Sequence, residues 1–162
     1  NYDDRSTDLF NWYQQLVAES LGKKNKGILP VVSNMPRDNH SLMQYYLDGV
    51  KNHFFTFFFV KEKNSKKIKN NQIYQSHSYL KNKNLNEIAF SQFAATETVF
   101  KKKNIPYRSF VIHKRSEEEL GELFTFFILE TILLAKAMKI NPFDQPAVEL
   151  IKTETSKILK NS

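Results

Sequence analysis

Apolar residues recur at the three- and four-residue spacing of an amphipathic helix in five stretches of the chain. The stretches that this spacing predicts to be helical are residues 6–21, 41–52, 85–103, 116–138 and a last one from about 144 onward. In the third helix the side chains expected to face inward are Ile88, Phe93, Ala95, Val99 and Phe100. The fourth begins with a capping box of Ser116 and Glu119, and its apolar run indicates a buried central helix.

Short apolar segments between these helices predict strands. Residues 54–60, FFTFFFV, are so uniformly apolar that helices must cover both faces of this strand. Residues 28–33 and 107–112 are predicted as two further strands, and residues 67–74 as an edge strand. Because strands alternate with helices along the chain, we predict an α/β fold, a three-layer α/β/α sandwich with a parallel sheet.

Composition limits the classes of protein that fit. With 162 residues and 41% hydrophobic content the chain is long enough for one packed core, so we expect a single domain. It has no Cys, which excludes disulfides and a cysteine nucleophile and suits the cytoplasm. It opens NYDDRSTD, without the basic start of a signal peptide. The apolar run at 123–138 is interrupted by Glu130 and Lys136, so we expect no membrane span and no membrane partner.

A net charge of +7 raises nucleic acid as a partner, since a basic surface attracts phosphates. Much of this charge lies in residues 61–71 and 101–103, which we expect to be a solvated loop and a helix end. On this reading the charge is ordinary surface charge, and no nucleic-acid partner is expected.

Residues 141–152, NPFDQPAVELIK, combine a turn, a helix start and several polar side chains. The Asn-Pro pair predicts the turn, and Asp144 suits the N-cap of the helix. Gln145, Glu149 and Lys152 follow at i, i+4 and i+7, so an amide, a carboxylate and an ammonium share one helix face. The side chains expected to pack inward are Val148, Ile151, Thr155, Ile158 and Leu159. By spacing alone the polar face is either a functional cluster or a capped surface helix with an ion pair.

Two other polar residues stand where catalytic groups are often found. Glu19 lies near the end of the first predicted helix, where the helix dipole disfavours a carboxylate and makes it a better proton acceptor. His40 stands between a loop and a helix, after a predicted strand, where parallel sheets place reacting groups. The alternatives are an exposed Glu on a polar face and a capping or surface His. The other histidines are assigned to such surface roles, namely His53, His77 and His113.

The string FDQPAVELIK at 143–152 resembles the C-terminal signature of the phosphoglucose isomerase family. Two more blocks agree with that family in order and spacing, WYQQLVAESLGKKNKGILP at 12–30 and DNHSLMQYYLDG at 38–49. One departure is Ala147, which stands where the family usually has Gly. The resemblance runs along the whole chain and corresponds to less than half of a family enzyme.

This resemblance implies a reaction and a set of site residues. The reaction is the interconversion of glucose 6-phosphate and fructose 6-phosphate through a cis-enediol, a step of glycolysis and gluconeogenesis in the cytoplasm. The resemblance implies that Glu19 is the catalytic base, that His40 opens the sugar ring with help from Lys152, and that Gln145 positions the substrate. It implies no metal and no organic cofactor.

The resemblance also implies which part of the enzyme this is. Residues 1–162 correspond to the second, C-terminal sugar-isomerase (SIS) domain, which has a flavodoxin-like architecture. The phosphate-binding loop and an enediol-stabilising Arg belong to the first SIS domain and the stretch after it, and each site is built from two subunits of a homodimer. We therefore expect this chain to carry part of a site and to be inactive alone. The alternative is a non-catalytic SIS module that binds or senses a sugar phosphate.

Overall fold

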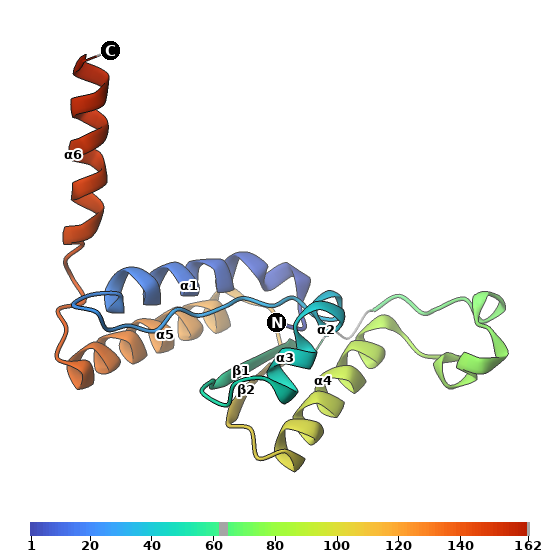
Figure 1. Cartoon of the computed structure of the whole chain (residues 1–162). Coiled ribbons are helices and arrows are strands. Elements are labelled where there is room, and N and C mark those ends of the chain that lie inside the picture. The colour runs from blue at the N-terminus through green and yellow to red at the C-terminus, as the bar shows by residue number, and fades with distance from the viewer. Residues whose placement is uncertain (62–64, 162) are drawn as a thin grey trace. The chain divides into compact units, whose positions relative to one another are not determined.

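The computed structural model describes residues 1–61 and 65–161, so residues 62–64 of the predicted solvated loop lie outside the described part of the chain. Its principal elements are α1 (Thr7–Leu21), α2 (Arg37–Ser41), α3 (Met43–Asp48), β1 (Phe55–Val60), α4 (Leu85–Lys102), β2 (Tyr107–Ile112), α5 (Glu117–Met138) and α6 (Pro146–Asn161) (Figure 1). Short 3-10 segments occur at Asp4–Ser6, Asn70–Gln72 and Gln75–Leu80. The chain divides into two compact units, residues 1–10 with 32–120 and residues 11–31 with 121 onward, and each has its own core.

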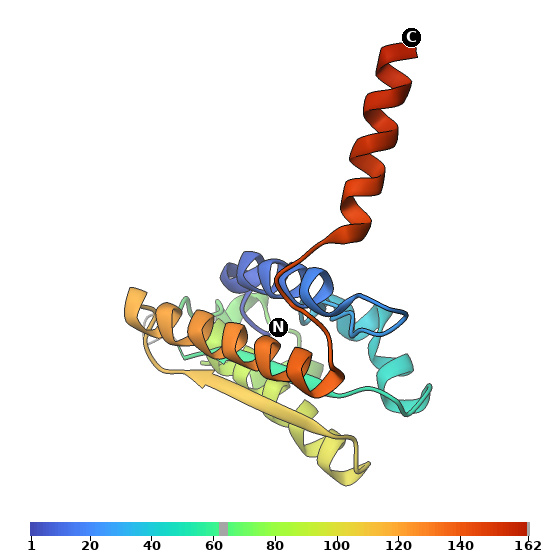
Figure 2. The same ribbon diagram turned by 90° about the vertical axis from the view of Figure 1, so that its left-hand side faces the viewer.

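The first unit is built around the parallel strands β1 and β2. They pair in register from Phe55 opposite Tyr107 to Val60 opposite Ile112, and the connection between them contains α4 (Figures 1 and 2). Parallel neighbours need such a crossover, because a tight turn reverses the chain. The strands predicted at 54–60 and 107–112 are therefore confirmed, the first of them beginning one residue later.

Both faces of β1 are buried, as its apolar sequence requires. Phe57 and Phe59 point to one face and belong to a core cluster that includes Phe93 and Phe100 of α4. Phe58 points to the opposite face, where its ring lies 4.9 Å from that of Phe10, edge to face. The N-terminal segment closes this core, because the Tyr2 N–H donates to the Phe58 carbonyl (2.9 Å). The predicted α/β class with a parallel sheet is confirmed.

The second unit contains the C-terminal part of α1 packed beside α5 (Figure 2). The ring of Trp12 lies 4.5 Å from that of Phe124, and Tyr13 lies 4.4 Å from Phe127. Its fully buried side chains are Val17, Leu21, Phe127, Thr131 and Ala135. The helical stripe predicted for the first helix is thus the contact surface between α1 and α5.

The strand predicted at 28–33 is wrong. Ile28, Leu29 and Val31 are 47%, 68% and 68% exposed, and the segment has no strand assignment. The Gln14 side-chain amide holds it by donating to the Pro30 carbonyl. An apolar run alone cannot specify a strand, because a strand also needs a partner to pair with its backbone.

The edge strand predicted at 67–74 is also wrong. Only an isolated bridge between Lys67 and Asn84 is present, and residues Asn70–Gln72 form a 3-10 turn. The Asn70 side chain is bonded to Asn82 through its amide (2.7 Å) and its carbonyl oxygen (2.9 Å). Asparagine side chains that bond nearby backbone favour turns over strands.

The helix predicted over 41–52 is replaced by two short helices. α2 starts at Arg37 and so contains His40, and Leu42 separates it from α3. The buried Asp38 carboxylate explains the early start, since it accepts bonds from the Asn34 N–H (2.7 Å) and the Ser41 hydroxyl (3.3 Å). The expected loop-to-helix junction at His40 is therefore wrong.

Three helices expose apolar side chains that were expected to be covered. In α4, Phe93 and Phe100 are buried as predicted, whereas Ala95 and Val99 are exposed. α5 is buried along one stripe only, and its exposed apolar side chains include Phe126, Ile128, Leu129 and Leu133. α6 is exposed along its whole length, including Val148, Ile151, Thr155, Ile158 and Leu159, so the inward packing predicted for it is wrong. Within the described residues, no helix has the length and apolar content that crossing a bilayer requires.

Candidate functional site

A candidate site lies at the end of α1, where the turn after α5 is tied to it. The chain reverses after α1 through a tight turn in which Lys24 and Asn25 have positive φ and Lys23 and Lys26 exchange backbone hydrogen bonds. Gly27 (φ +145) closes this turn, and a Cβ there would lie 3.0 Å from the Gly22 Cα. Both the φ value and the close approach explain a glycine at this position, since φ in this range strains other residues.

Two lysines of this turn bind carbonyl groups at and after the end of α5. The Lys23 ammonium donates to the Asn141 carbonyl (2.6 Å), and the Lys26 ammonium donates to the Met138 carbonyl (3.2 Å). Helix C-termini leave carbonyls without intrahelical partners and carry a partial negative charge, so cations stabilise them. These contacts fix the segment that leads to residues 141–145.

Lys23 also forms an ion pair with Asp144 (2.9 Å). Its side chain is only 10% exposed, whereas that of Asp144 is 54% exposed. The hydrogen bond from Lys23 lowers the pKa of Asp144 below its ordinary value of 3.8. Asp144 therefore links the turn to α1, in place of the N-cap role predicted for it, and α6 begins two residues later, at Pro146.

This arrangement brings two of the predicted site residues together. The Gln145 amide donates to one carboxylate oxygen of Glu19 (3.0 Å), although the two lie 126 positions apart in sequence. The other Glu19 oxygen accepts from Gln15, one helical turn earlier (3.0 Å). The Glu19 side chain is exposed. The carboxylate is thus held by two amides at the surface.

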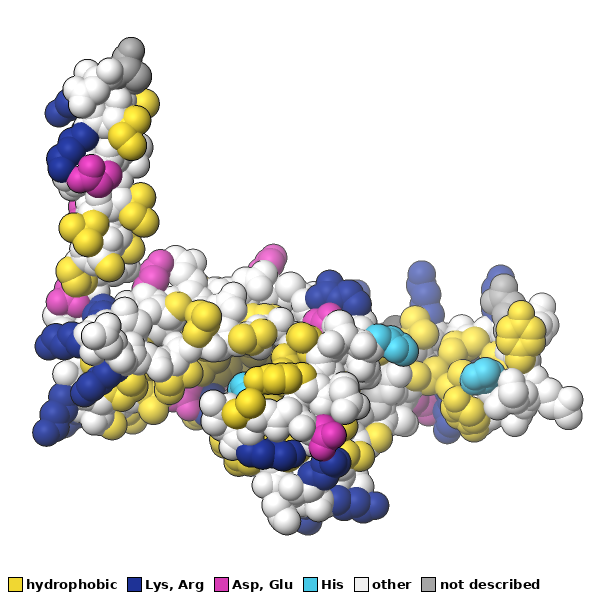
Figure 3. All heavy atoms as spheres, viewed as in Figure 1, with side chains coloured by type: hydrophobic (Ala, Val, Ile, Leu, Met, Phe, Trp, Pro, Cys, Tyr) yellow, Lys and Arg dark blue, Asp and Glu magenta, His cyan; other side chains and the backbone are white. Residues whose placement is uncertain are grey.

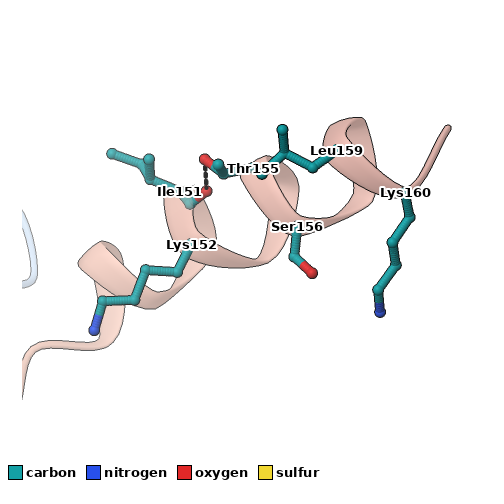
Figure 4. A pocket seen from close by; sticks show the side chains of 6 residues that line it. All are labelled: Ile151, Lys152, Thr155, Ser156, Leu159 and Lys160. Atoms are coloured by element: carbon teal, nitrogen blue, oxygen red, sulfur yellow. Dashed lines mark hydrogen bonds between the residues drawn. The ribbon is translucent and has the colours of Figure 1, made fainter. Parts of the chain in front are cut away.

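Lys152 lies on α6 and pairs with Glu149 on the same helix face (2.6 Å). Both side chains are 66% exposed, so the pair contributes little to stability. Beside Lys152 runs a shallow strip lined by Ile151, Thr155, Ser156, Leu159 and Lys160, all from this one helix (Figure 4). A strip with walls from a single helix does not enclose a ligand.

His40, the fourth predicted site residue, belongs to the first compact unit. It is exposed in the last turn of α2. Two residues earlier, Asp38 is held by the Arg37 guanidinium through Nε (2.8 Å) and Nη2 (3.1 Å). The hydrogen bond from Arg37 lowers the pKa of Asp38 to about 2, so Asp38 stays ionised and fixes the short helix that carries His40.

Sequence reasoning missed Lys23, Gln15 and Asp38 as supporting residues. The pattern places Lys23 in a simple turn, and its only sequence signal is a Lys after the Gly that ends a helix. Asp38 stands two positions before His40. Ser41, three positions after Asp38, can donate a hydrogen bond to its carboxylate, which is an Asx-type pattern. In the described residues, no cluster of three or more His, Asp or Glu side chains is placed to hold a metal ion.

The chain was compared with known proteins. No protein-family model matches it. A protein named probable glucose-6-phosphate isomerase from Methanococcus maripaludis is 36% identical over 162 residues, which is 99% of this chain and 36% of that protein. A glucose-6-phosphate isomerase from Mycoplasmopsis pulmonis is 36% identical over 166 residues, covering 99% of this chain and 38% of that one. This chain therefore spans well under half the length of these relatives.

Two solved structures share the fold of this chain. The crystal structure of a hypothetical protein from Thermus thermophilus matches 98% of this chain and 40% of its own, with a TM-score of 0.89 and 26% identity. A glucose-6-phosphate isomerase from Chlamydia trachomatis matches 98% of this chain and 33% of its own, with a TM-score of 0.79 and 17% identity, which concerns the fold alone. The resemblance to the phosphoglucose isomerase family is thereby confirmed: this chain is homologous to glucose-6-phosphate isomerases over nearly its whole length.

Proposed function

We propose that this chain is the second SIS domain of a glucose-6-phosphate isomerase that interconverts glucose 6-phosphate and fructose 6-phosphate. The observation that carries the proposal is the 3.0 Å hydrogen bond between Gln145 and Glu19. The fold alone does not require an amide and a carboxylate from distant segments to meet at the surface. They meet here through the Lys23 contacts, which orient the turn before α6.

The proposed chemistry has three tasks. An acid/base pair opens the sugar ring, a carboxylate moves a proton between C1 and C2, and a cation steadies the enediolate. Glu19 is proposed as the carboxylate base, His40 as the ring-opening residue with help from Lys152, and Gln145 as the group that positions the substrate. A carboxylate acting on a carbon acid follows the pattern of other sugar-phosphate isomerases. The proposal includes no metal or organic cofactor.

Phosphate binding is proposed to come from elsewhere in the intact protein. The four glycines of this chain form neither a GxGxxG turn nor a P-loop. We propose that the first SIS domain supplies the phosphate loop, that two subunits of a homodimer complete each site, and that the enzyme works in the cytoplasm. This chain then holds the acid/base part of a composite site.

The proposal is tested on the full-length protein with a coupled assay of fructose 6-phosphate turnover. Glu19→Gln should lower kcat by far more than tenfold, and a loss within about tenfold, or about 1.4 kcal/mol of barrier, would show that Glu19 is not the base. Glu122→Gln, an exposed Glu on α5, is the matched control and should leave the rate unchanged. Absence of isomerase activity in the unaltered full-length protein would refute the proposed function itself.

A further inference from the structure

An exposed basic lobe formed by residues 65–83 lies outside the proposed isomerase site. Its two ends are held together, because the Ile68 N–H donates to the Lys83 carbonyl (3.1 Å) and the Leu85 N–H donates to the Lys66 carbonyl (3.0 Å). The bonds between the Asn70 side chain and Asn82 close the same base. The lobe is therefore a defined structural element with a tied base.

The lobe concentrates positive charge. It contains five exposed lysines and neither Asp nor Glu; the lysines are Lys66, Lys67, Lys69, Lys81 and Lys83. The tied base places lysines from both of its ends close together. The next acidic residue along the chain, Glu87, caps α4 in a capping box with Asn84. Positive charge of this density attracts a polyanion.

The lobe also presents aromatic rings to solvent. Tyr74 is 82% exposed and Tyr79 is 70% exposed, and the ring of His77 lies 6.0 Å from that of Tyr79. In Figure 3, hydrophobic, basic and histidine side chains lie together on the surface of this lobe. Exposed aromatic rings beside lysines are the combination by which proteins bind single-stranded nucleic acids, since unpaired bases stack on the rings while lysines contact the phosphates.

We propose that this lobe binds single-stranded nucleic acid without sequence preference. The expectation of a merely solvated loop rests on charge alone, and it does not account for two exposed tyrosines in the same lobe as the five lysines. A membrane surface fits less well, because the aliphatic side chains that would insert among acyl chains, those of Ile68, Ile73 and Leu80, are half-buried. The proposal is independent of the isomerase site.

The test is fluorescence anisotropy with a labelled oligouridylate of about 12 nucleotides, within the usual range of site sizes. Each phosphate neutralised on a single strand contributes about −0.7 to the slope of log K against log salt, so five lysines give at most about −3.5. We expect a slope between about −2 and −3.5, hence at least about tenfold weaker binding at about 200 mM than at about 50 mM salt. A duplex of equal length should bind more weakly, because its bases are already stacked.

Two variants separate charge from stacking. Tyr74→Ala/Tyr79→Ala should weaken binding at least fivefold, since stacking on one ring is worth about that factor or more. Lys66→Gln/Lys69→Gln/Lys81→Gln should weaken it at least tenfold and flatten the salt slope. The matched control is Lys101→Gln/Lys102→Gln/Lys103→Gln, which removes the same charge from the exposed end of α4 and should have a small effect.

Several results would overturn the proposal. They are no binding at about 50 mM salt, an equal loss in the control triple variant, and unchanged binding in the tyrosine variant. Tighter association with phosphatidylserine vesicles than with the oligonucleotide would assign the lobe to membranes and would also overturn it. Because all readouts are binding measurements, failure here leaves the isomerase assay untouched.

Discussion

Lys23 and Asp144 form an ion pair of 2.9 Å that joins the turn after α1 to the turn before α6. Together with the bond from Lys23 to the Asn141 carbonyl, it fixes residue 145 next to Glu19. A surface ion pair contributes little to stability on average. Its importance here is positional, since it sets where an amide meets a carboxylate.

Lys23→Met should loosen the segment 139–145 without unfolding the protein. The variant keeps the apolar stem and removes the cation that holds both Asp144 and the Asn141 carbonyl. Amide hydrogen exchange should accelerate in 139–145 and stay unchanged in β1. Lys24→Met, on the exposed neighbour, is the control. Equal exchange rates of residues 139–145 in the two variants would show that the Lys23 side chain does not hold this segment.

The ion pair between Lys23 and Asp144 should weaken as the pH falls. The pKa of Asp144 is lowered from 3.8 in the folded protein, so the ion pair contributes fully above the unfolded value and is lost as pH falls through the folded one. Exchange in 139–145 should therefore be slow at neutral pH and accelerate relative to β1 below about pH 4. In Asp144→Asn this acid-induced change should be absent.

If the full-length protein is the proposed isomerase, Gln145→Leu should lower its kcat/KM by about tenfold, equivalent to about 1.4 kcal/mol. The substitution removes the amide that meets Glu19 across the turn, which we propose also positions substrate. Gln15→Leu removes the other amide on Glu19 but leaves the turn in place, so its effect should be smaller. If Gln15→Leu were the more damaging of the two, Gln145 would have no positioning role.

Asp38→Asn should destabilise the first unit by about 1.5–3 kcal/mol, because the buried carboxylate accepts charge-assisted bonds. The pKa of Asp38 falls from 3.8 to about 2 on folding, so its contribution is present above pH 3.8 and is lost as pH falls to about 2. Urea unfolding should show the gap between wild type and variant shrinking over that window. Asp48→Asn, on an exposed residue of α3, should show no such gap.

Phe100→Ala should cost about 3–5 kcal/mol, since it removes a fully buried ring that contacts Phe55, Phe57 and Tyr107. Phe143→Ala is the matched control: that side chain is 80% exposed, and the change should stay within about 0.5 kcal/mol. Chemical denaturation of both variants measures the difference. Comparable losses would mean that the packing around α4 contributes less than its burial indicates.

The chain of residues 1–162 by itself should unfold cooperatively and turn over little or no fructose 6-phosphate. Each unit has a core of its own, whereas the proposed reaction needs binding energy from the substrate phosphate to orient C1 and C2. Thermal unfolding and turnover should be measured on the same sample. Robust turnover would show that a complete phosphate site exists within these residues.

Local patterns predicted several elements correctly, although their packing partners lie far away in sequence. The periodicity of α1 and α4 was sufficient because a helix forms its backbone hydrogen bonds within itself, and the strands predicted at 54–60 and 107–112 were correct because they pair with each other. Residues 28–33 are also mostly apolar, but the pattern cannot say whether another strand is available to pair with them. The inward packing predicted for α6 was wrong for the same reason, since periodicity identifies an apolar helix face without identifying what covers it.

The arrangement of the candidate site could also be predicted only in part from the sequence. Gln145, Glu149 and Lys152 were predicted to form one polar face, and Glu149 does pair with Lys152. Gln145 instead lies before α6 and bonds Glu19, because Lys23 holds the turn. A contact that depends on a Lys side chain reaching a carbonyl far along the chain leaves no periodic signal in the sequence.

The bond from the Tyr2 N–H to the Phe58 carbonyl has a kinetic consequence. It closes a loop of roughly 55 residues. Contacts that close loops of this length form late, because the chain loses conformational entropy before the contact can stabilise it. Pairing of β1 with β2 closes a loop of similar length, from Phe55 to Tyr107, but α4 forms within that loop and packs on β1 through Phe93 and Phe100, which leaves less chain to order. Folding of the first unit should therefore start in this segment and end with the docking of residues 1–10, which should also be the first part to detach when the protein unfolds.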